Sequence, residues 1–374
     1  MRVVIRDGMS GVDDAFVELP RLVYVGDPSW IPEEEAPVRA AFSAANPWFA
    51  RGRALTLVVP GRARLAVFHD DACTIDGQPA AYFGYWEHIG DAEANARLFA
   101  EAEAWARLRG ANVLCGPVNF TTLGTYRLRT AAERGAVPFP SEPYNPASYP
   151  HMLCTLGYAI TRAFLTYVGP IRSELLAPKL ERRREVLDAG YTLEPLDGER
   201  WMALLPELHR AADEIFGEGL GYTPVSLEAF RVACGAPIAR RLDPDASLLA
   251  RAADGSLAGF FLTYPHYGPL AVQGAGSSRV PASALSFAAH APLLAKMGCR
   301  TGIAKTVGVA RAHRRRGVMD ALALSAIERG SARYDTWLGA MMREGNPSTR
   351  FGSPHAEHER RYALYGKVLY DVAA

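Results

Sequence analysis

The chain carries the same order of expected elements twice, and this repeat constrains its fold more than any other feature of the sequence. Each half reads as a strand, a hairpin, a further strand, a helix, a strand and a helix. No identity between the halves is visible, so the repeat is inferred from element order alone. It predicts an α+β fold of two tandem domains, residues 1–170 and 171–374, each a mixed, mostly antiparallel sheet flanked by helices.

Turn and cap residues mark the elements of the first half. Asp76 and Gly77 are typical of a two-residue hairpin turn, and Asp91 can cap a helix that Gly110 ends. We expect helices over residues 16–23, 91–109 and 149–156. The expected strands cover residues 3–6, 55–59, 64–68, 80–87, 113–115 and 164–168.

The second half repeats the pattern with a more basic beginning. Asp254 and Gly255 again predict a hairpin turn. The expected strands cover residues 191–194, 247–252, 257–263, 303–309 and 335–341. We expect helices over residues 181–187, 200–216, 227–233, 282–296, 318–328 and 355–365.

Composition narrows the function classes. The 374 residues suffice for two domains of ordinary size, and 49% are hydrophobic, as in globular rather than disordered proteins. Lysine plus arginine (41) nearly balances aspartate plus glutamate (40), so the net charge of +1 argues against extensive binding to nucleic acid or an anionic membrane. The first residues lack the apolar run of a signal peptide, and the most apolar stretch, 285–297, is too short to span a bilayer.

The cysteines and histidines do not predict a metal site. No CxxC or Cys/His ligand spacing joins the cysteines, which we expect to be reduced thiols of a cytoplasmic protein. His355 and His358 share a face of the expected last helix, but their charged neighbours favour a solvated surface. The five cysteines are Cys73, Cys115, Cys154, Cys234 and Cys299.

The segment from Lys305 to Leu322 indicates chemistry most clearly. An alternating strand runs into a basic turn and then into an apolar helix that begins at Gly317. Such a turn directs backbone N–H groups and a helix N-terminus toward one point, where an anionic phosphate is stabilised. Three consecutive arginines add positive charge there, and a glycine permits close backbone approach. The alternative is a surface turn with solvated arginines.

This segment resembles the acyl-CoA pyrophosphate loop of the GNAT superfamily, which has Arg or Gln, two residues, Gly, one residue, then Gly or Ala. Met319 stands where that family has a small residue. The strand before the loop resembles the strand whose main chain pairs with the pantetheine arm. The resemblance implies that the cofactor-binding residues are Val307, Val309, Arg314, Arg315, Arg316, Gly317, Val318 and Met319.

The resemblance extends to residues after the next strand. Asn346 matches an asparagine that contacts the cofactor, and Tyr365 matches a helical tyrosine that protonates the leaving thiolate. Each can instead be structural, as a turn cap and a core aromatic. Acyl transfer to an amine also needs a proton acceptor, for which Glu344, Glu87 and His266 are the candidates near strand ends.

The first half also resembles a GNAT domain, within an uncharacterised family of bacterial double-GNAT proteins that covers nearly the whole chain. The matching runs include residues 27–32, 83–87, 116–120 and 142–149. No basic glycine loop precedes the helix at Asp91, whose carboxylate would repel phosphate. We therefore expect no CoA in the first half, which would shape the acceptor cleft together with loops 216–224 and 264–276.

The resemblance implies an acyltransferase that uses acetyl-CoA or another acyl-CoA as co-substrate, without a metal. An amine of a small molecule would attack the thioester directly, and an acyl carrier protein is an alternative source of the thioester. A Fem-type aminoacyl-tRNA-dependent transferase is a second hypothesis, in which nucleic acid contact is limited to the acceptor end of tRNA. A non-catalytic ligand-binding protein of the same fold is the third.

Overall fold

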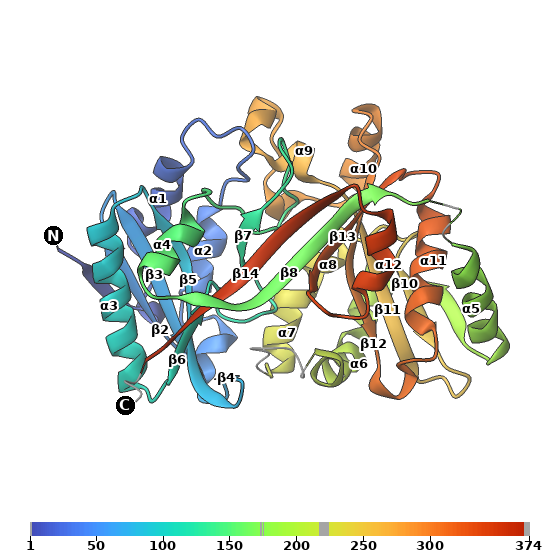
Figure 1. Cartoon of the computed structure of the whole chain (residues 1–374), viewed down its shortest axis with the longest axis horizontal. Helices are drawn as coiled ribbons and strands as arrows, with labels where there is room; N and C mark the ends of the chain where they lie inside the picture. The colour runs from blue at the N-terminus through green and yellow to red at the C-terminus, as the bar shows by residue number, and fades with distance from the viewer. Residues whose placement is uncertain (1, 173, 175, 217–223, 370–374) are drawn as a thin grey trace.

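A computed structural model describes residues 2–172, 174, 176–216 and 224–369, and one mixed sheet runs through it (Figure 1). The first half contributes β1 (Val4–Asp7), β2 (Arg53–Val59), β3 (Ala63–His69), β4 (Thr74–Ile75), β5 (Gln78–His88), β6 (Val113–Gly116), β7 (Leu128–Ala131) and β8 (Ala159–Pro170). The second half contributes β9 (Thr192–Pro195), β10 (Leu248–Arg251), β11 (Leu257–Pro265), β12 (Thr301–Val309), β13 (Thr336–Arg343) and β14 (His358–Val368).

Helices pack against this sheet in both halves (Figure 1). Those of the first half are α1 (Asp14–Val23), α2 (Glu35–Ala41), α3 (Ala92–Leu108) and α4 (Tyr149–Thr155). Those of the second half are α5 (Ala177–Asp188), α6 (Gly198–Phe216), α7 (Leu227–Cys234), α8 (Ala236–Ala239), α9 (Gly268–Ala271), α10 (Phe287–Lys296), α11 (Val318–Gly330) and α12 (Thr349–Gly352). No helix among the described residues is both long and apolar enough to cross a membrane.

The strand order shows the duplicated architecture. It runs β1-β2-β3-β5-β6-β14-β8-β13-β12-β11-β10-β9, with β4 beside β5 and β7 beside β14. Among the described strands, two neighbouring pairs are parallel, β5 with β6 and β12 with β13, and the rest are antiparallel. Each parallel pair is connected through a helix, α3 or α11. The predicted α+β class with mostly antiparallel sheets is thereby confirmed.

The last strands of the two halves cross over at the centre of the sheet. Strand β14, from the end of the chain, pairs with β6, and β8 pairs with β13. The two strands also pair with each other along most of their length, as the long red and green strands of Figure 1 show. The predicted helix over 355–365 is therefore wrong. Its Ala, Glu, Arg and Leu residues favour a helix locally, but pairing with both neighbouring strands prevails.

Local signals elsewhere gave the expected elements. Asp76 and Gly77 both adopt left-handed conformations (φ 51° and 78°), as their hairpin turn requires. The carboxylate of Asp91 accepts from the N–H of Ala94 at 2.9 Å and caps α3. The helix expected over 282–296 is shorter, because a 3-10 turn at Ala282–Ala284 precedes α10.

Apolar side chains cover both faces of the sheet in each half. On β3, Leu65 and Val67 pack with α3, while the alternate residue Phe68 packs on the side of α1 and α2. On β11, Phe260 joins the cluster that includes α6 and α10, and Phe261 joins the one beneath α11. Burial on both faces explains the near-continuous apolar runs of these strands.

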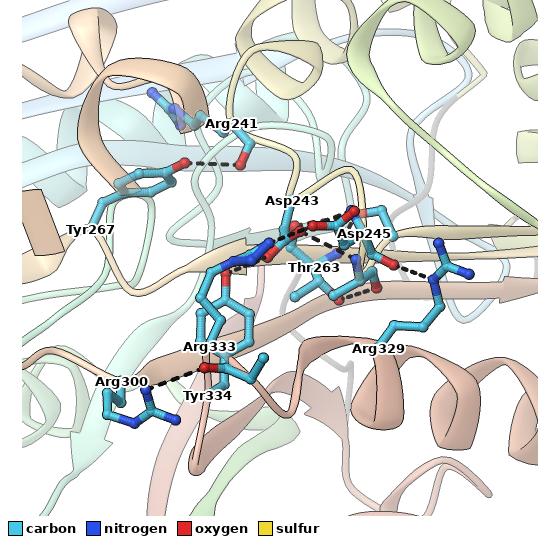
Figure 2. A network of polar contacts seen from close by, with 12 residues as sticks. Arg241, Asp243, Asp245, Thr263, Tyr267, Arg300, Arg329, Arg333 and Tyr334 are labelled. Carbon is cyan, nitrogen blue, oxygen red and sulfur yellow. Dashed lines mark hydrogen bonds and ion pairs between the residues drawn. The ribbon is translucent and has the colours of Figure 1, made fainter. Parts of the chain in front are cut away.

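A buried carboxylate fixes the C-terminal end of α11 to the segment before β10 (Figure 2). Asp243 is fully buried and accepts hydrogen bonds from the Tyr334 hydroxyl at 2.7 Å and Arg333 Nε at 3.1 Å. Arg333 also contacts Asp245 at 2.5 Å, and Arg329 donates to the Asp245 carbonyl oxygen at 2.6 Å. These contacts anchor the C-terminal end of α11, and the N-terminal end of the same helix lies away from them.

Candidate functional site

Strands β12 and β13 separate partway along their length and leave a groove. They pair from Thr301 to Ala304 and from Thr336 to Gly339. Beyond these residues a groove of about 100 Å³ lies between the two strands, with α11 and α12 beside it. Its mostly apolar lining includes Val307, Met319, Ala323, Trp337, Ala340, Met342 and Phe351. Such a lining suits an apolar or amphipathic chain.

The N-terminus of α11 carries positive charge and has no side-chain cap. Gly317 occupies the N-cap position in a left-handed conformation (φ 82°), and no side-chain cap of the first turn is found within the described structure. Arg315 and Arg316 are exposed beside it. Arg182 of α5 lies against Gly317, because a Cβ added there would sit 2.4 Å from the Arg182 Cδ atom. These features favour an anion at the end of the helix.

One buried histidine presents an unused donor at the groove. His355, in the 3-10 turn Ser353–His355, lines the groove and is 3% exposed. Its Nδ1 accepts from the Arg172 N–H at 3.0 Å, and its Nε2 has no partner among the described residues. Burial lowers the pKa of His355, and Lys179 and Arg172 lower it further. The neutral ring therefore carries its proton on Nε2 as a hydrogen-bond donor.

A β-bulge interrupts β12 beside the groove. Thr306 pairs with Leu262 and Ala304 with Thr263, so Lys305 between them has no counterpart on β11. The ammonium of Lys305 lies 5.7 Å from the centre of the Phe139 ring, at the wall of a second cavity. Burial and two nearby guanidinium groups lower the pKa of Lys305 from 10.5 to about 8.

The corresponding gap of the first half is filled by the chain itself. Between β5 and β6, Val118 N–H donates to the Phe83 carbonyl oxygen at 2.7 Å, and Tyr85 N–H donates to the Asn119 side chain at 2.8 Å. A Cβ at Gly84 would meet the Val118 carbonyl oxygen at 2.4 Å. Asp91 occupies the start of α3, so an anion would meet a carboxylate there.

The first half instead holds a larger, polar cavity of about 360 Å³ on the side of α1 and α2. Glu87 at the end of β5 accepts from the hydroxyl groups of Tyr24 at 3.1 Å and Tyr149 at 2.7 Å. Burial raises the pKa of Glu87 from 4.5 to about 7, although Arg64 and both tyrosines lower it. Arg64 lines the same cavity and pairs with Glu33 at 2.8 Å.

The structure brings part of the predicted cofactor set together. Val307 and Met319 line the groove, so the methionine contributes to its wall. Gly317, Arg315 and Arg316 lie at the start of α11. Val309 ends β12, and Val318 is buried at the start of α11.

Arg314 differs from its two neighbours. Its side chain donates to the carbonyl oxygens of Val309 at 3.3 Å and Ile215 at 3.2 Å, so it ties the loop to the end of α6. Asn346 is exposed and accepts from Ser348 N–H at 3.0 Å, which makes it a turn cap.

The structure does not bring the predicted catalytic residues to the groove. Tyr365 lies on β14, opposite Gly116, and its side chain belongs to the core of the first half. The thiolate-protonating role implied by the resemblance therefore does not carry over to Tyr365. Glu344 is exposed, and its nearest charged partner is Arg361 at 3.9 Å.

The remaining candidates fall into different environments. His266 uses both ring nitrogens within the fold, with Val137 O at 3.1 Å and Gly268 N at 3.1 Å. Glu87 lies in the polar cavity. His355 and His358 do not share a helix, because the first lies in a 3-10 turn and the second begins β14. Of the expected cleft loop over 216–224, residues 217–223 lie outside the described residues.

Two further residues at these sites had no local signal in the sequence. Lys305 stands in an alternating strand, and the bulge that redirects it depends on pairing with β11. Arg127 lines the polar cavity and contacts Met341 of the second half, more than 200 positions away. The contacts of Lys305 and Arg127 form only when distant segments of the chain come together in the fold.

Comparison with solved structures shows a shared fold. A tandem GNAT protein from the clavulanic acid biosynthesis pathway matches over 99% of both chains with a TM-score of 0.53 at 13% identity. A probable N-acyltransferase from Enterococcus faecalis matches over 98% of this chain and 72% of its own, with a TM-score of 0.52 at 10% identity. A GCN5-related glucosamine N-acetyltransferase region of a fungal β-N-acetylglucosaminidase matches with a TM-score of 0.51 at 13% identity, over 98% of this chain and 38% of the other.

Comparison with curated protein sequences matches a smaller part of the chain. Protein YghO of Escherichia coli is 31% identical over 112 residues, which span 28% of this chain and 28% of that protein. No family profile matches the chain. The structural matches establish that the chain has the tandem GNAT fold.

Proposed function

We propose that this chain of tandem GNAT fold is an acyltransferase that moves an acyl group from a thioester to the amine of a small molecule. The thioester would be carried by CoA or by the pantetheine arm of a carrier protein. The observation that supports this proposal is the opening between β12 and β13, whose apolar groove lies beside the uncapped start of α11. Among the described residues of the first half, Val118 and Asn119 bridge the corresponding strands, so no such opening is found there.

Residues in and beside the groove suit both the amphipathic arm and the pyrophosphate of such a donor. Val307 and Met319 would contact the amphipathic arm. The first-turn N–H groups of α11 would bind the pyrophosphate, with Arg315 and Arg316 beside them. The thioester supplies an acyl carbonyl group that is open to attack by an amine.

The chain would assist this attack through hydrogen bonds. A backbone N–H of the bulge at Lys305 would donate to the thioester carbonyl oxygen, where negative charge develops. The Nε2–H of His355 would donate to the sulfur end of the same group, since it is buried in the groove wall and has no other partner in the described part of the chain. His355 would thus take the place at the leaving thiolate that the resemblance gave to Tyr365.

The acceptor would approach from the opposite side of the gap. Ala304 and Thr306 line the groove, whereas Lys305 between them contacts Phe139 at the wall of the polar cavity. We assign this cavity of the first half to the acceptor, which would place the two substrates on either side of the β12–β13 opening.

The experiment measures release of free thiol from acetyl-CoA in the presence of a panel of amines, for the full chain and two variants of His355. Phenylalanine in place of His355 removes the donor and is expected to lower kcat by about tenfold or more, with little change in the Kd of CoA. Glutamine can still donate and is expected to retain more activity than phenylalanine.

Two outcomes count against the proposal. Equal kcat for both variants and the wild type would remove His355 from the reaction. No amine-dependent thiol release from any acyl-CoA or acylated carrier protein would contradict thioester-dependent transfer. Transfer from a charged tRNA in the same assay would then favour the Fem-type alternative.

A further inference from the structure

Two cationic side chains, Arg127 and Lys305, lie between the polar cavity and strands β12 and β13. Arg127 lines the cavity and donates to the carbonyl oxygen of Met341 on β13 at 3.3 Å. Lys305 of β12 lies behind the cavity wall, with its ammonium 5.7 Å from the ring centre of Phe139, a residue that lines the cavity. The guanidinium group of Arg127 lowers the pKa of Lys305, so each charge lies within the field of the other.

Arg127 is buried without a counterion among the described residues. It is 8% exposed, and its guanidinium carbon lies 3.7 Å from the ring centre of Tyr126 and 4.1 Å from that of Phe164. Its Nε is buried without a hydrogen-bond partner in the described chain. Its other nitrogens contact the hydroxyl of Tyr126 and the sulfur and carbonyl oxygen of Met341. Burial of a cation without a carboxylate is unfavourable for the empty protein.

The acidic residues of the cavity are all engaged elsewhere. Glu33 pairs with Arg64 at 2.8 Å, and Glu142 pairs with Arg360 at 2.8 Å. Glu34 accepts from Ser283 N–H at 2.7 Å. Glu87 accepts from two tyrosine hydroxyls at the end of β5. None of these carboxylates has an ion pair with Arg127 or Lys305 within the described residues, and only Glu142 raises the pKa of Lys305, against the lowering by burial and by Arg127.

The backbone around the cavity is strained at residues that line it. Tyr85, Arg127 and Ser141 have φ values of 48°, 85° and 74°, in the left-handed region that side chains other than glycine rarely adopt. Arg127 is held in this conformation by its N–H, which donates to Pro117 O at 2.9 Å. Strain and an uncompensated charge thus coincide at one residue of the cavity wall, as is common at binding sites.

We propose that Arg127 and Lys305 form an anion subsite in the acceptor cavity, so that the acceptor carries a carboxylate or phosphate group near its amine. The guanidinium group of Arg127 and the ammonium of Lys305 would both donate to the anionic group. Identification of the ligand as the acceptor rests on the proposed acyl transfer, whereas the subsite itself is tested by anion binding alone.

The test titrates the full chain with sodium acetate and with inorganic phosphate at constant ionic strength, by calorimetry. The variants are Arg127→Met and Lys305→Met, with Arg109→Met as a matched control. Arg109 is an exposed guanidinium 3.9 Å from the ring centre of Trp105, outside the cavity. We expect the wild type to bind an anion in the cavity in addition to any phosphate at the start of α11, and we expect each cavity variant to weaken the cavity binding about tenfold or more and the control to leave it unchanged. Preference for acetate indicates a carboxylate, and preference for phosphate indicates a phosphate.

Thermal unfolding separates a binding role from a structural one. Removal of a buried unpaired cation is expected to leave the Tm of ligand-free Arg127→Met equal to or above that of the wild type. A lower Tm together with unchanged anion binding would make Arg127 structural and overturn the proposal. Absence of anion binding, or acetate and phosphate binding that is identical in the wild type and both cavity variants, would overturn it as well.

A parallel CoA titration keeps the two proposals distinguishable. The Arg127→Met variant should bind CoA with a Kd within about twofold of the wild type, because Arg127 does not line the groove. If the wild type binds the anion but not CoA, the proposal of an acyl-CoA donor is contradicted and the proposal of the anion subsite still holds. If the wild type binds CoA but neither acetate nor phosphate, the proposal of the anion subsite is contradicted and the proposed acyltransferase function still holds.

Discussion

Substitution of Glu87 by glutamine should change how the stability of the protein depends on pH. Burial raises the pKa of Glu87 to about 7 in the folded protein, from 4.5 when the group is free in water. Because the folded state binds this proton more tightly than the unfolded state, the wild type gains stability from it at low pH. That stability is fully present below about pH 4.5 and is lost as the pH rises through 7.

The size of the effect follows from the two pKa values. Between pH 5 and pH 8 the free energy of unfolding of the wild type should fall by about 2.5 kcal/mol through Glu87 alone. Water that enters the cavity screens the buried charge, so this value is an upper limit. Glutamine cannot titrate but can still accept from Tyr24 and Tyr149. The Glu87→Gln variant should therefore gain stability over the wild type as the pH rises.

Urea unfolding of both proteins at several pH values between 5 and 8 measures this difference. We expect the two curves of unfolding free energy against pH to diverge, with the variant above the wild type at pH 8. Parallel curves would show that Glu87 ionises as easily in the folded protein as in water, and would refute the argument from burial.

Two stability predictions test other parts of the structure. Replacement of Asp243 by asparagine leaves Arg333 and Tyr334 without their carboxylate partner. We expect this variant to lose about 3 kcal/mol of unfolding free energy, measured by urea unfolding. A loss below about 1 kcal/mol would show that the network adds little to stability. Alanine at Gly317 must adopt φ 82° and displace Arg182, whereas alanine at Gly255 (φ 81°) meets nothing within 4 Å. Because both positions share the cost of a left-handed conformation, the clash with Arg182 should make the Gly317 variant lose about 1 kcal/mol more than the Gly255 variant, and equal losses would contradict the close packing of α5 on the loop.

Sequence reasoning succeeded where the determinants are local. The turn at Asp76 and the cap at Asp91 involve neighbours within three residues, so their conformations could be predicted. The groove residues Val307 and Met319 were identified through the resemblance to the GNAT pyrophosphate loop, whose strand, glycine turn and helix follow one another directly in the chain.

The prediction failed where distant partners decide the structure. Residues 358–368 have a helical composition, but Arg360 ion-pairs with Glu133 and Glu142, more than 200 positions earlier, and the segment becomes β14. Tyr365 moves with that strand into the core of the first half. The ring of His355 accepts from the N–H of Arg172, which is far away in the chain, and such a tertiary contact has no local signal in the sequence.

The central claim is that the donor lies in the groove between β12 and β13 of the second half. Calorimetric titration of CoA into the wild type and Met319→Trp tests it most directly, because a tryptophan at that position fills the groove. Met297→Trp is the matched control, since this methionine is 54% exposed and lines neither cavity. We predict that CoA binds the wild type and the control and that Met319→Trp loses this binding. Equal affinity of Met319→Trp and the wild type, or no binding of CoA to the wild type, would contradict the claim.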